Sequence, residues 1–265
     1  MYIRPLNAHA RINHNHPLAS SLIGAWVFGN FLRTRSVAGR GEPLEVISGS
    51  PTLGTDDNGP YLSTTASDYT STGKIHLGGR ERYSAFTFIK PITISSTKCI
   101  IGEANGTSTP FAIGLLTGAS GPELRTLIRP TGGGADVDYS SASVLQNGVA
   151  IKIGVSIDLS ASGAVSRTYA NGSQVASGTR PATWGSTASA GATFGFRINV
   201  APLIARQYVI YTFSGYLSAN NHAMLARDPW QLIEFIPAFE PWIGAQGGAA
   251  AADYTNQSFN FMMPV

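Results

Sequence analysis

Cysteine and charge are both scarce in this chain of 265 residues, and each scarcity excludes a class of protein. Cys99 is the only cysteine and lies in an apolar stretch, so the sequence has no disulfide framework and no cysteine-based metal spacing. Only 12% of the residues are charged, and the 18 basic and 15 acidic side chains are scattered along the chain. Nucleic-acid binding requires a concentrated basic patch, so no nucleic acid is expected as a partner.

Long hydrophobic runs and catalytic motifs are also missing. No stretch approaches the roughly 18 apolar residues of a membrane span, and the N-terminus lacks the basic-then-apolar layout of a secretion signal. We therefore expect synthesis in a cytoplasm and no membrane insertion. There is no G-x-S-x-G, H-E-x-x-H or phosphate-binding glycine pattern, and no glutamate is followed two residues later by aspartate. We expect no catalytic residue, no cofactor and no enzymatic activity.

Glycine and proline are plentiful instead, with 30 and 15 residues. Together with serine and threonine they separate short apolar segments, such as residues 22–29, 84–94, 99–103, 111–116 and 150–158. This regular spacing of turns predicts an antiparallel β-sandwich, and all-β domains of this length are common as single units.

Residues 204–213 predict a central strand, because large apolar side chains alternate on both of its faces. These are Val209, Tyr211 and Phe213 on one face, and Tyr208 and Ile210 on the other. A short helix should follow, capped by Ser218 and ended by Pro229. Trp230 is then expected to enter the core.

This order of strand, Ser-Gly-Tyr-Leu-Ser, short helix and Asp-Pro-Trp-Gln-Leu resembles the closing segment of one family of domains. The family comprises the concanavalin A-like (laminin-G-like) jelly-roll domains of structural proteins of tailed bacteriophages. A Tyr-x-Asn-Gly hairpin at residues 169–172 is similar to a second part of that family. The helix departs from the family pattern, because Asn221 and His222 stand where the family has an acidic residue and an isoleucine.

The resemblance implies an all-β, antiparallel jelly-roll β-sandwich at residues 20–236, with an N-terminal arm at 1–19 and a C-terminal arm at 237–265. It further implies a virion structural protein, a capsid decoration or cement protein joined to its neighbours through these arms. Its partners would then be other copies of the chain and the major capsid or tail proteins. The first alternative is a glycan-binding adsorption module that recognises host-surface glycans, and the second is a glycan hydrolase.

Candidate contact residues follow from these alternatives. The C-terminal arm ends in an alternating apolar segment that could pair with a partner's sheet edge. Its interface candidates are Tyr254, Phe259, Phe261, Met262 and Met263. For a glycan, the candidates are aromatic side chains able to stack on sugar rings, namely Tyr69, Tyr139 and Trp184.

One turn is rich in side-chain oxygens. Asp56, Asp57 and Asn58 make it a weak calcium candidate. Calcium takes about six to eight oxygen ligands, which is more than this turn supplies, so no metal is expected.

Overall fold

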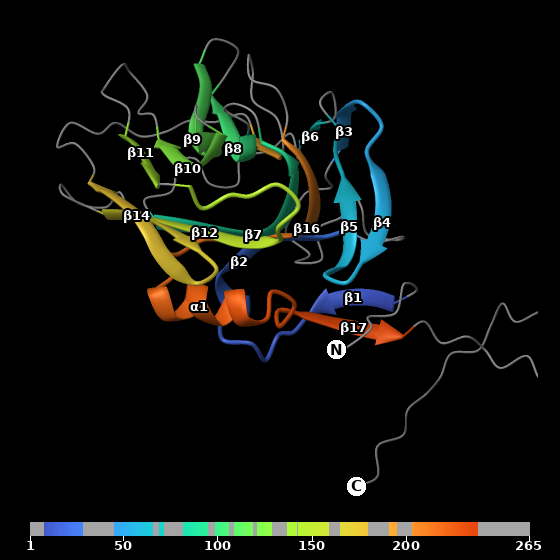
Figure 1. Ribbon diagram of the computed structural model, residues 1–265. Helices are drawn as coiled ribbons and strands as arrows, with labels where there is room; N and C mark the ends of the chain where they lie inside the picture. Colours follow the sequence, from blue (N-terminus) through green and yellow to red (C-terminus); the bar gives the residue numbers. More distant parts are fainter. Residues whose placement is uncertain are drawn as a thin grey trace, which may run out of the picture.

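The computed structural model describes residues 8–28, 45–65, 69–71, 82–94, 99–105, 109–118, 121–128, 137–141, 143–158, 165–179, 191–194 and 203–237. Two large sheets, here called sheets I and II, face each other, and a two-stranded ribbon lies outside them (Figure 1). Every pairing between the described strands is antiparallel. The all-β jelly-roll sandwich predicted from the sequence is confirmed.

The elements have the following bounds. Sheet I has the order β14 (Ser173–Thr179), β13 (Val165–Ala170), β12 (Ile151–Asp158), β7 (Arg82–Thr93), β16 (Ile204–Phe213), β5 (Gly59–Ser63) and β4 (Thr52–Asp56), and β2 (Leu22–Val27) also pairs with β16. Sheet II has the order β11 (Val137–Ser141), β10 (Gly121–Ile128), β9 (Thr109–Gly118), β8 (Cys99–Asn105), β15 (Gly191–Phe194), β6 (Tyr69–Ser71) and β3 (Glu45–Ser48). The ribbon pairs β1 (Ala8–Ile12) with β17 (Ile233–Pro237). A 3₁₀ turn (Ala19–Ser21) and helix α1 (Ala219–Arg227) are the described helical elements.

The interior between the two sheets is filled by alternate residues of the strands. Strand β12 shows this clearly, since its four odd-numbered residues Ile151, Ile153, Val155 and Ile157 are all buried in one core cluster. Within this interior the hydroxyls of Thr126 and Thr168 meet across the sheets at 2.7 Å. Each buried aliphatic side chain contributes about 1.5–3 kcal/mol, so the interior stabilises the stacking of the sheets.

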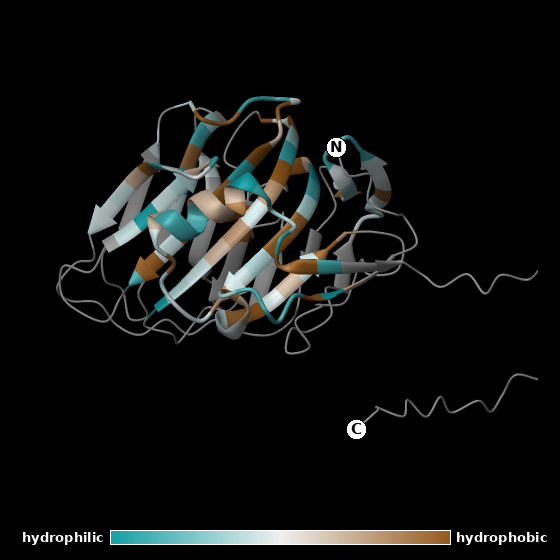
Figure 2. Cartoon of the chain, turned by 90° about the horizontal axis from the view of Figure 1, so that it is seen from below, coloured by the Kyte–Doolittle hydropathy of each residue, from teal (hydrophilic) through white to brown (hydrophobic). Residues whose placement is uncertain are grey.

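The outer face of sheet I carries a second apolar core. Helix α1, the β1–β17 ribbon and the segments 13–21 and 228–232 cover it (Figure 1). Seen from that side, α1 lies across the strands with apolar residues beneath it (Figure 2). Backbone hydrogen bonds hold the cover in place, from Asn13 to Leu232 at 2.9 Å and from Ser214 to Ser21 at 2.8 Å.

Strand β16 is central, as the sequence predicts, but the division of its faces differs. A bulge shifts its register against β7 between Gln207 and Val209. Because a bulge adds one residue, Tyr208 and Val209 both lie on the outer face, whereas Ile210 lies in the interior. The expectation that Tyr208 and Ile210 share a face is therefore wrong.

The closing helix begins and ends as expected. The side chain of Ser218 accepts a hydrogen bond from the Asn221 amide at 3.3 Å, and the Asp228 amide donates to the Met224 carbonyl. Trp230 is 5% exposed and lies against Gly59, whose φ of +121° favours glycine. A Cβ at Gly59 would approach the indole to 2.9 Å, so this glycine makes room for the buried tryptophan.

The segments predicted as arms lie only partly within the described residues. Part of the segment assigned to the N-terminal arm forms β1, and Ile12 and Leu18 are buried in the outer core. The C-terminal arm beyond Pro237 lies outside the described residues, and the domain boundaries stay a prediction.

The predicted hairpin is present, with φ values of 50° at Asn171 and 86° at Gly172. Within the described part of the chain, no helix is long and apolar enough to cross a membrane.

Replacing Trp230 with alanine should lower the free energy of unfolding by about 3–5 kcal/mol, as for other buried large-to-small changes. Urea titrations of the two proteins would measure this change. Val149→Ala is the matched control, because Val149 is 50% exposed and its loss should change stability by less than about 0.5 kcal/mol. Equal, small effects of both substitutions would show that the outer core does not depend on the indole.

Candidate functional site

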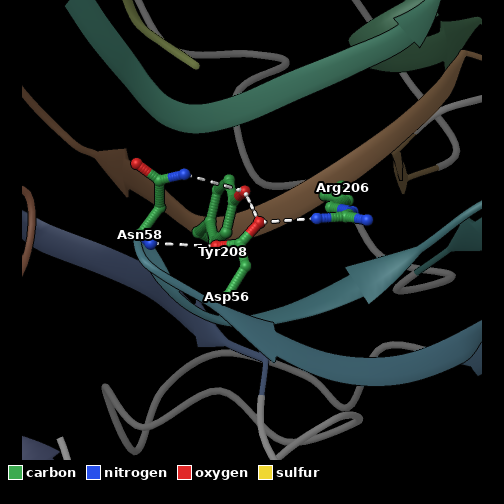
Figure 3. A network of polar contacts seen from close by, with 4 residues as sticks. All are labelled: Asp56, Asn58, Arg206 and Tyr208. Carbon is green, nitrogen blue, oxygen red and sulfur yellow. Dashed lines mark hydrogen bonds and ion pairs between the residues drawn. The ribbon is translucent and has the colours of Figure 1, made fainter. Parts of the chain in front are cut away.

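The candidate site lies where the β4–β5 hairpin meets the bulged part of β16. Strand β5 pairs with β16 at Arg206 and Gln207, immediately before the bulge. Arg206 and Tyr208 both lie on the outer face, so they reach the hairpin turn beside them (Figure 3). The bulge thus separates a polar end of β16 from its apolar remainder.

The Asp56 carboxylate is the centre of this site (Figure 3). Its Oδ2 accepts hydrogen bonds from Arg206 Nη1 and from the Tyr208 hydroxyl, each at 2.8 Å. Its Oδ1 accepts from the Asn58 backbone amide at 2.9 Å, and the Asn58 side-chain amide donates to the Tyr208 hydroxyl at 3.3 Å. A single carboxylate therefore fixes two strands, β4 and β16, and the β4–β5 turn relative to one another.

These contacts set the protonation states of the site. Burial acts to raise the pKa of the Asp56 carboxyl, but the Asn58 amide, the Tyr208 hydroxyl and Arg206 stabilise the ionised form and hold the pKa below its usual value. Burial raises the pKa of the Tyr208 hydroxyl, and the hydrogen bond to Asp56 raises it further. At neutral pH the site holds a carboxylate, a neutral phenol and a guanidinium.

Tyr61 forms the aromatic part of the site. The guanidinium of Arg206 lies over its ring, 4.7 Å from the centroid, and the ring meets that of Tyr208 edge-on at 6.0 Å. Gly54 opposes Tyr61 across the hairpin, and a Cβ there would come within 2.5 Å of the Tyr61 hydroxyl. The side chains of Tyr61 and Arg206 are only partly buried, and 34% of the Arg206 side chain is exposed. The site therefore presents a fixed aromatic and cationic surface to solvent.

The calcium candidates occupy this turn, but the arrangement does not favour a cation. Asp56 already binds the guanidinium of Arg206, and a positive charge at 2.8 Å opposes a second cation. Asp57 is exposed, and Asn58 uses both its backbone and side-chain amides within the site. Among the described residues, no group of three or more His, Cys, Asp or Glu is arranged to hold a metal ion.

The other candidates are not brought together by the described structure. Tyr69 lies in β6 and Tyr139 in β11, both in sheet II, and their side chains lie outside the described part. Trp184 and the interface candidates Tyr254, Phe259, Phe261, Met262 and Met263 lie wholly outside the described residues. Their roles stay predictions.

Sequence reasoning missed Arg206, Tyr61 and the role of Tyr208. A signal was present in Arg206, the single charged residue of the central strand Ile204–Phe213. A buried strand tolerates such a charge only where a partner or solvent is at hand. The hairpin acid Asp56 is that partner, but the pairing of β5 with β16 could not be read from the sequence.

A second polar cluster lies beneath α1. His222 Nε2 is 2.7 Å from Ser156 Oγ, which is 2.8 Å from Ser84 Oγ. The imidazole stacks on Tyr169 with centroids 4.1 Å apart, and it lies so close to Gly154 that a Cβ there would collide with Nδ1. The imidazole of His222 is thus accommodated by a glycine in the strand below.

This serine and histidine pair is not a catalytic centre. His222 is 1% exposed, and among the described residues its Nδ1 has no hydrogen-bond partner that could orient the ring as a catalytic base. Burial lowers the pKa of His222 to about 3, so the ring is neutral at neutral pH. The pair serves instead to attach α1 to sheet I.

Comparisons with known proteins identify the fold. No family model matches the chain, and no curated protein matches it in sequence. Among solved structures, the binding domain of Paraclostridial Mosquitocidal Protein 1 matches with a TM-score of 0.63 and 10% identity over 80% of this chain and 53% of that chain. The binding domain of Botulinum Neurotoxin DC in complex with SialylT matches with a TM-score of 0.59 and 13% identity, over 79% and 52% of the respective chains.

A third match covers nearly the whole of a smaller domain. Domain 4 of AbnA, a GH43 extracellular arabinanase from Geobacillus stearothermophilus, solved in complex with arabinotriose, matches with a TM-score of 0.55 and 15% identity, over 78% of this chain and 98% of that one. This chain spans about half the length of the toxin binding domains it matches. At these identities the likeness shows the β-sandwich fold alone, and the function implied by the resemblance stays a proposal.

The buried His222 predicts a loss of stability in acid. Its pKa is about 6.5 in the unfolded chain and about 3 in the folded protein, so the unfolded chain binds the proton more tightly. Stability from the neutral ring is fully present above pH 6.5 and falls as the pH drops from 6.5 towards 3. Urea titrations at pH 7, 5.5 and 4 should show this decline, and His222→Leu should make it shallower. His14→Asn, at an exposed histidine, should leave the slope unchanged. Parallel slopes for wild type and His222→Leu would contradict the assignment.

Proposed function

We propose that this chain is a glycan-binding module and that its sugar contacts lie on the Tyr61–Arg206 surface, formed by Tyr61, Arg206, Asp56 and Asn58. The arrangement of Arg206 carries the proposal. A guanidinium has five N–H donors, and among the described residues Asp56 is its only hydrogen-bond acceptor. The remaining donors, held beside a partly exposed tyrosine, suit the hydroxyl groups and apolar ring faces of a sugar.

The similar structures support this proposal through their fold. One of them was solved in complex with arabinotriose and another in complex with SialylT, so this kind of sandwich accommodates saccharides in other proteins. Two of the three are named as binding domains. The proposed activity is accordingly recognition of a glycan without chemical change, and a host-surface glycan is the proposed partner.

The proposal predicts that Tyr61→Leu lowers glycan affinity by about tenfold, because leucine keeps an apolar side chain against the outer core but removes the aromatic face. Wild type is first screened on an array of neutral and acidic glycans, and the best-binding glycan is then titrated calorimetrically against each variant. Thermal melting confirms that the variants are folded.

Tyr216→Leu is the matched control, because Tyr216 is a partly buried tyrosine in the loop between β16 and α1. Its replacement should leave the affinity unchanged. Equal losses of affinity in both variants would show that the sugar site is not at Tyr61. An array without any bound glycan would refute the glycan-binding proposal.

A second candidate function is a structural protein of a tailed-phage virion, such as a capsid decoration protein. The closing segment favours it, because the Ser218-capped helix and the buried Trp230 occur in the order that the resemblance rests on. In that case the partners would be other virion proteins and further copies of this chain, and the C-terminal arm would be the connector.

Under this second candidate, deleting residues 247–265 should abolish joining to particles or oligomers while leaving the melting temperature nearly unchanged. The sandwich does not need the deleted residues, because both of its described cores are formed by residues 12–233. Size-exclusion chromatography with light scattering and a particle-binding assay would measure the two effects. Undiminished assembly of the truncated protein would show that the arm is not the connector.

A further inference from the structure

A row of side chains crosses the outer face of sheet I beside the proposed sugar site. Lys152 Nζ lies 4.9 Å from the centroid of the Phe88 ring, which stacks on Tyr208 at 4.5 Å. Tyr208 meets Tyr61 edge-on, and Arg206 lies over Tyr61. The row thus has three aromatic rings, on β7, β16 and β5, with one cation over each end.

A third cation, Lys90, adjoins this row. The register of β7 and β16 places Lys90 directly opposite Arg206, and β12 places Lys152 directly opposite Phe88. Because alternate residues of a strand share a face, Lys90 lies on the same face as Phe88 and diagonal to Lys152, at about 7–8 Å. Like charges directly opposite each other destabilise a sheet, so the Lys90 and Arg206 pair has an energetic cost in the free protein.

The acidic groups of the described structure do not offset these charges. Asp56 is the single carboxylate in ion-pair contact with any of the three cations, and it pairs with Arg206. Neither Lys90 nor Lys152 forms an ion pair with any described acidic residue. All three cations are partly exposed, so an anion from solvent can reach them.

Exposed apolar side chains lie near Lys90. Ile92, two residues after Lys90 in β7, is 43% exposed and is one of two large hydrophobic residues that stand out to solvent in the described structure. A hydrogen bond of 2.7 Å from the Gly148 amide to the Pro91 carbonyl brings the second, Val149, to this end of the sheet. Cations beside exposed apolar and aromatic groups match a ligand that carries both negative charge and apolar ring faces.

We infer that the ligand of this module is an acidic saccharide, whose carboxylate or sulfate group is bound by Lys90, Lys152 and Arg206. This inference rests on the proposed glycan-binding function and adds the chemical class of the sugar. Arg206 presents its planar donors to the anionic group, Lys90 adds a point charge beside it, and Lys152 adds a second at the Phe88 end of the aromatic row.

The test is an array on which uronate-containing, sialylated and sulfated glycans each stand beside a carboxyl-reduced or desulfated counterpart. The full chain should bind acidic members and lose at least about tenfold in affinity for their neutral counterparts. Loss of binding on carboxyl reduction would identify a carboxylate as the bound group, and loss of binding on desulfation would identify a sulfate. Lys90→Gln and Lys152→Gln should each weaken binding of the best acidic glycan by about fivefold, and rising salt should weaken wild-type binding.

Arg227→Gln is the charge-matched control, because Arg227 is an exposed cation at the end of α1 and its loss changes the net charge equally. It should keep wild-type affinity. Equal binding of acidic glycans and their neutral counterparts would overturn the inference while leaving the glycan-binding proposal intact, whereas an array with no bound glycan would refute both. If Arg227→Gln loses as much affinity as the lysine variants, the losses reflect overall charge and the inference is overturned. Tighter binding of a single-stranded oligonucleotide than of any glycan would also overturn it.

Discussion

Burial of strand β16 on both faces is the constraint on which the rest of the molecule depends. Ile210 enters the interior between the sheets, whereas Val209, Tyr211 and Phe213 need a cover on the outside. A sandwich of two sheets supplies only the interior. The outer face would leave large aromatic surface in water, so the chain adds α1, the β1–β17 ribbon and the turn with Trp230 as a third, partial layer.

The bulge in β16 accompanies the candidate site at one end of this strand. It changes which face the residues after it occupy, so that Tyr208 and Arg206 share the outer face with the alternate apolar residues that follow Tyr208. The hairpin beside them supplies Asp56, and the glycines of that hairpin give space to Tyr61 and Trp230. Polar contacts between distant parts of the chain thus form at the place where the apolar cover ends.

Local pattern made much of the fold predictable from the sequence. The alternation in β12, the Asn171–Gly172 turn and the Ser218 cap are set by neighbouring residues, and all three are present. The side on which Tyr208 lies depends on a bulge between two strands, which no short-range pattern reports. For the same reason the sequence offered Asp56 only as a weak calcium candidate, since its partner Arg206 is distant in sequence and joins it only through strand pairing.

The charge distribution explains why this end of the sheet is suited to recognition. Lys90 and Arg206 repel each other, yet the strands hold them in register and the aromatic row holds Arg206 and Lys152 in position. An anion between these cations would remove the repulsion as well as add contacts, so part of its binding free energy would come from relief of a cost already present in the free protein. Side chains held by packing lose little conformational entropy on binding, which favours a rigid surface of this kind over mobile lysines alone.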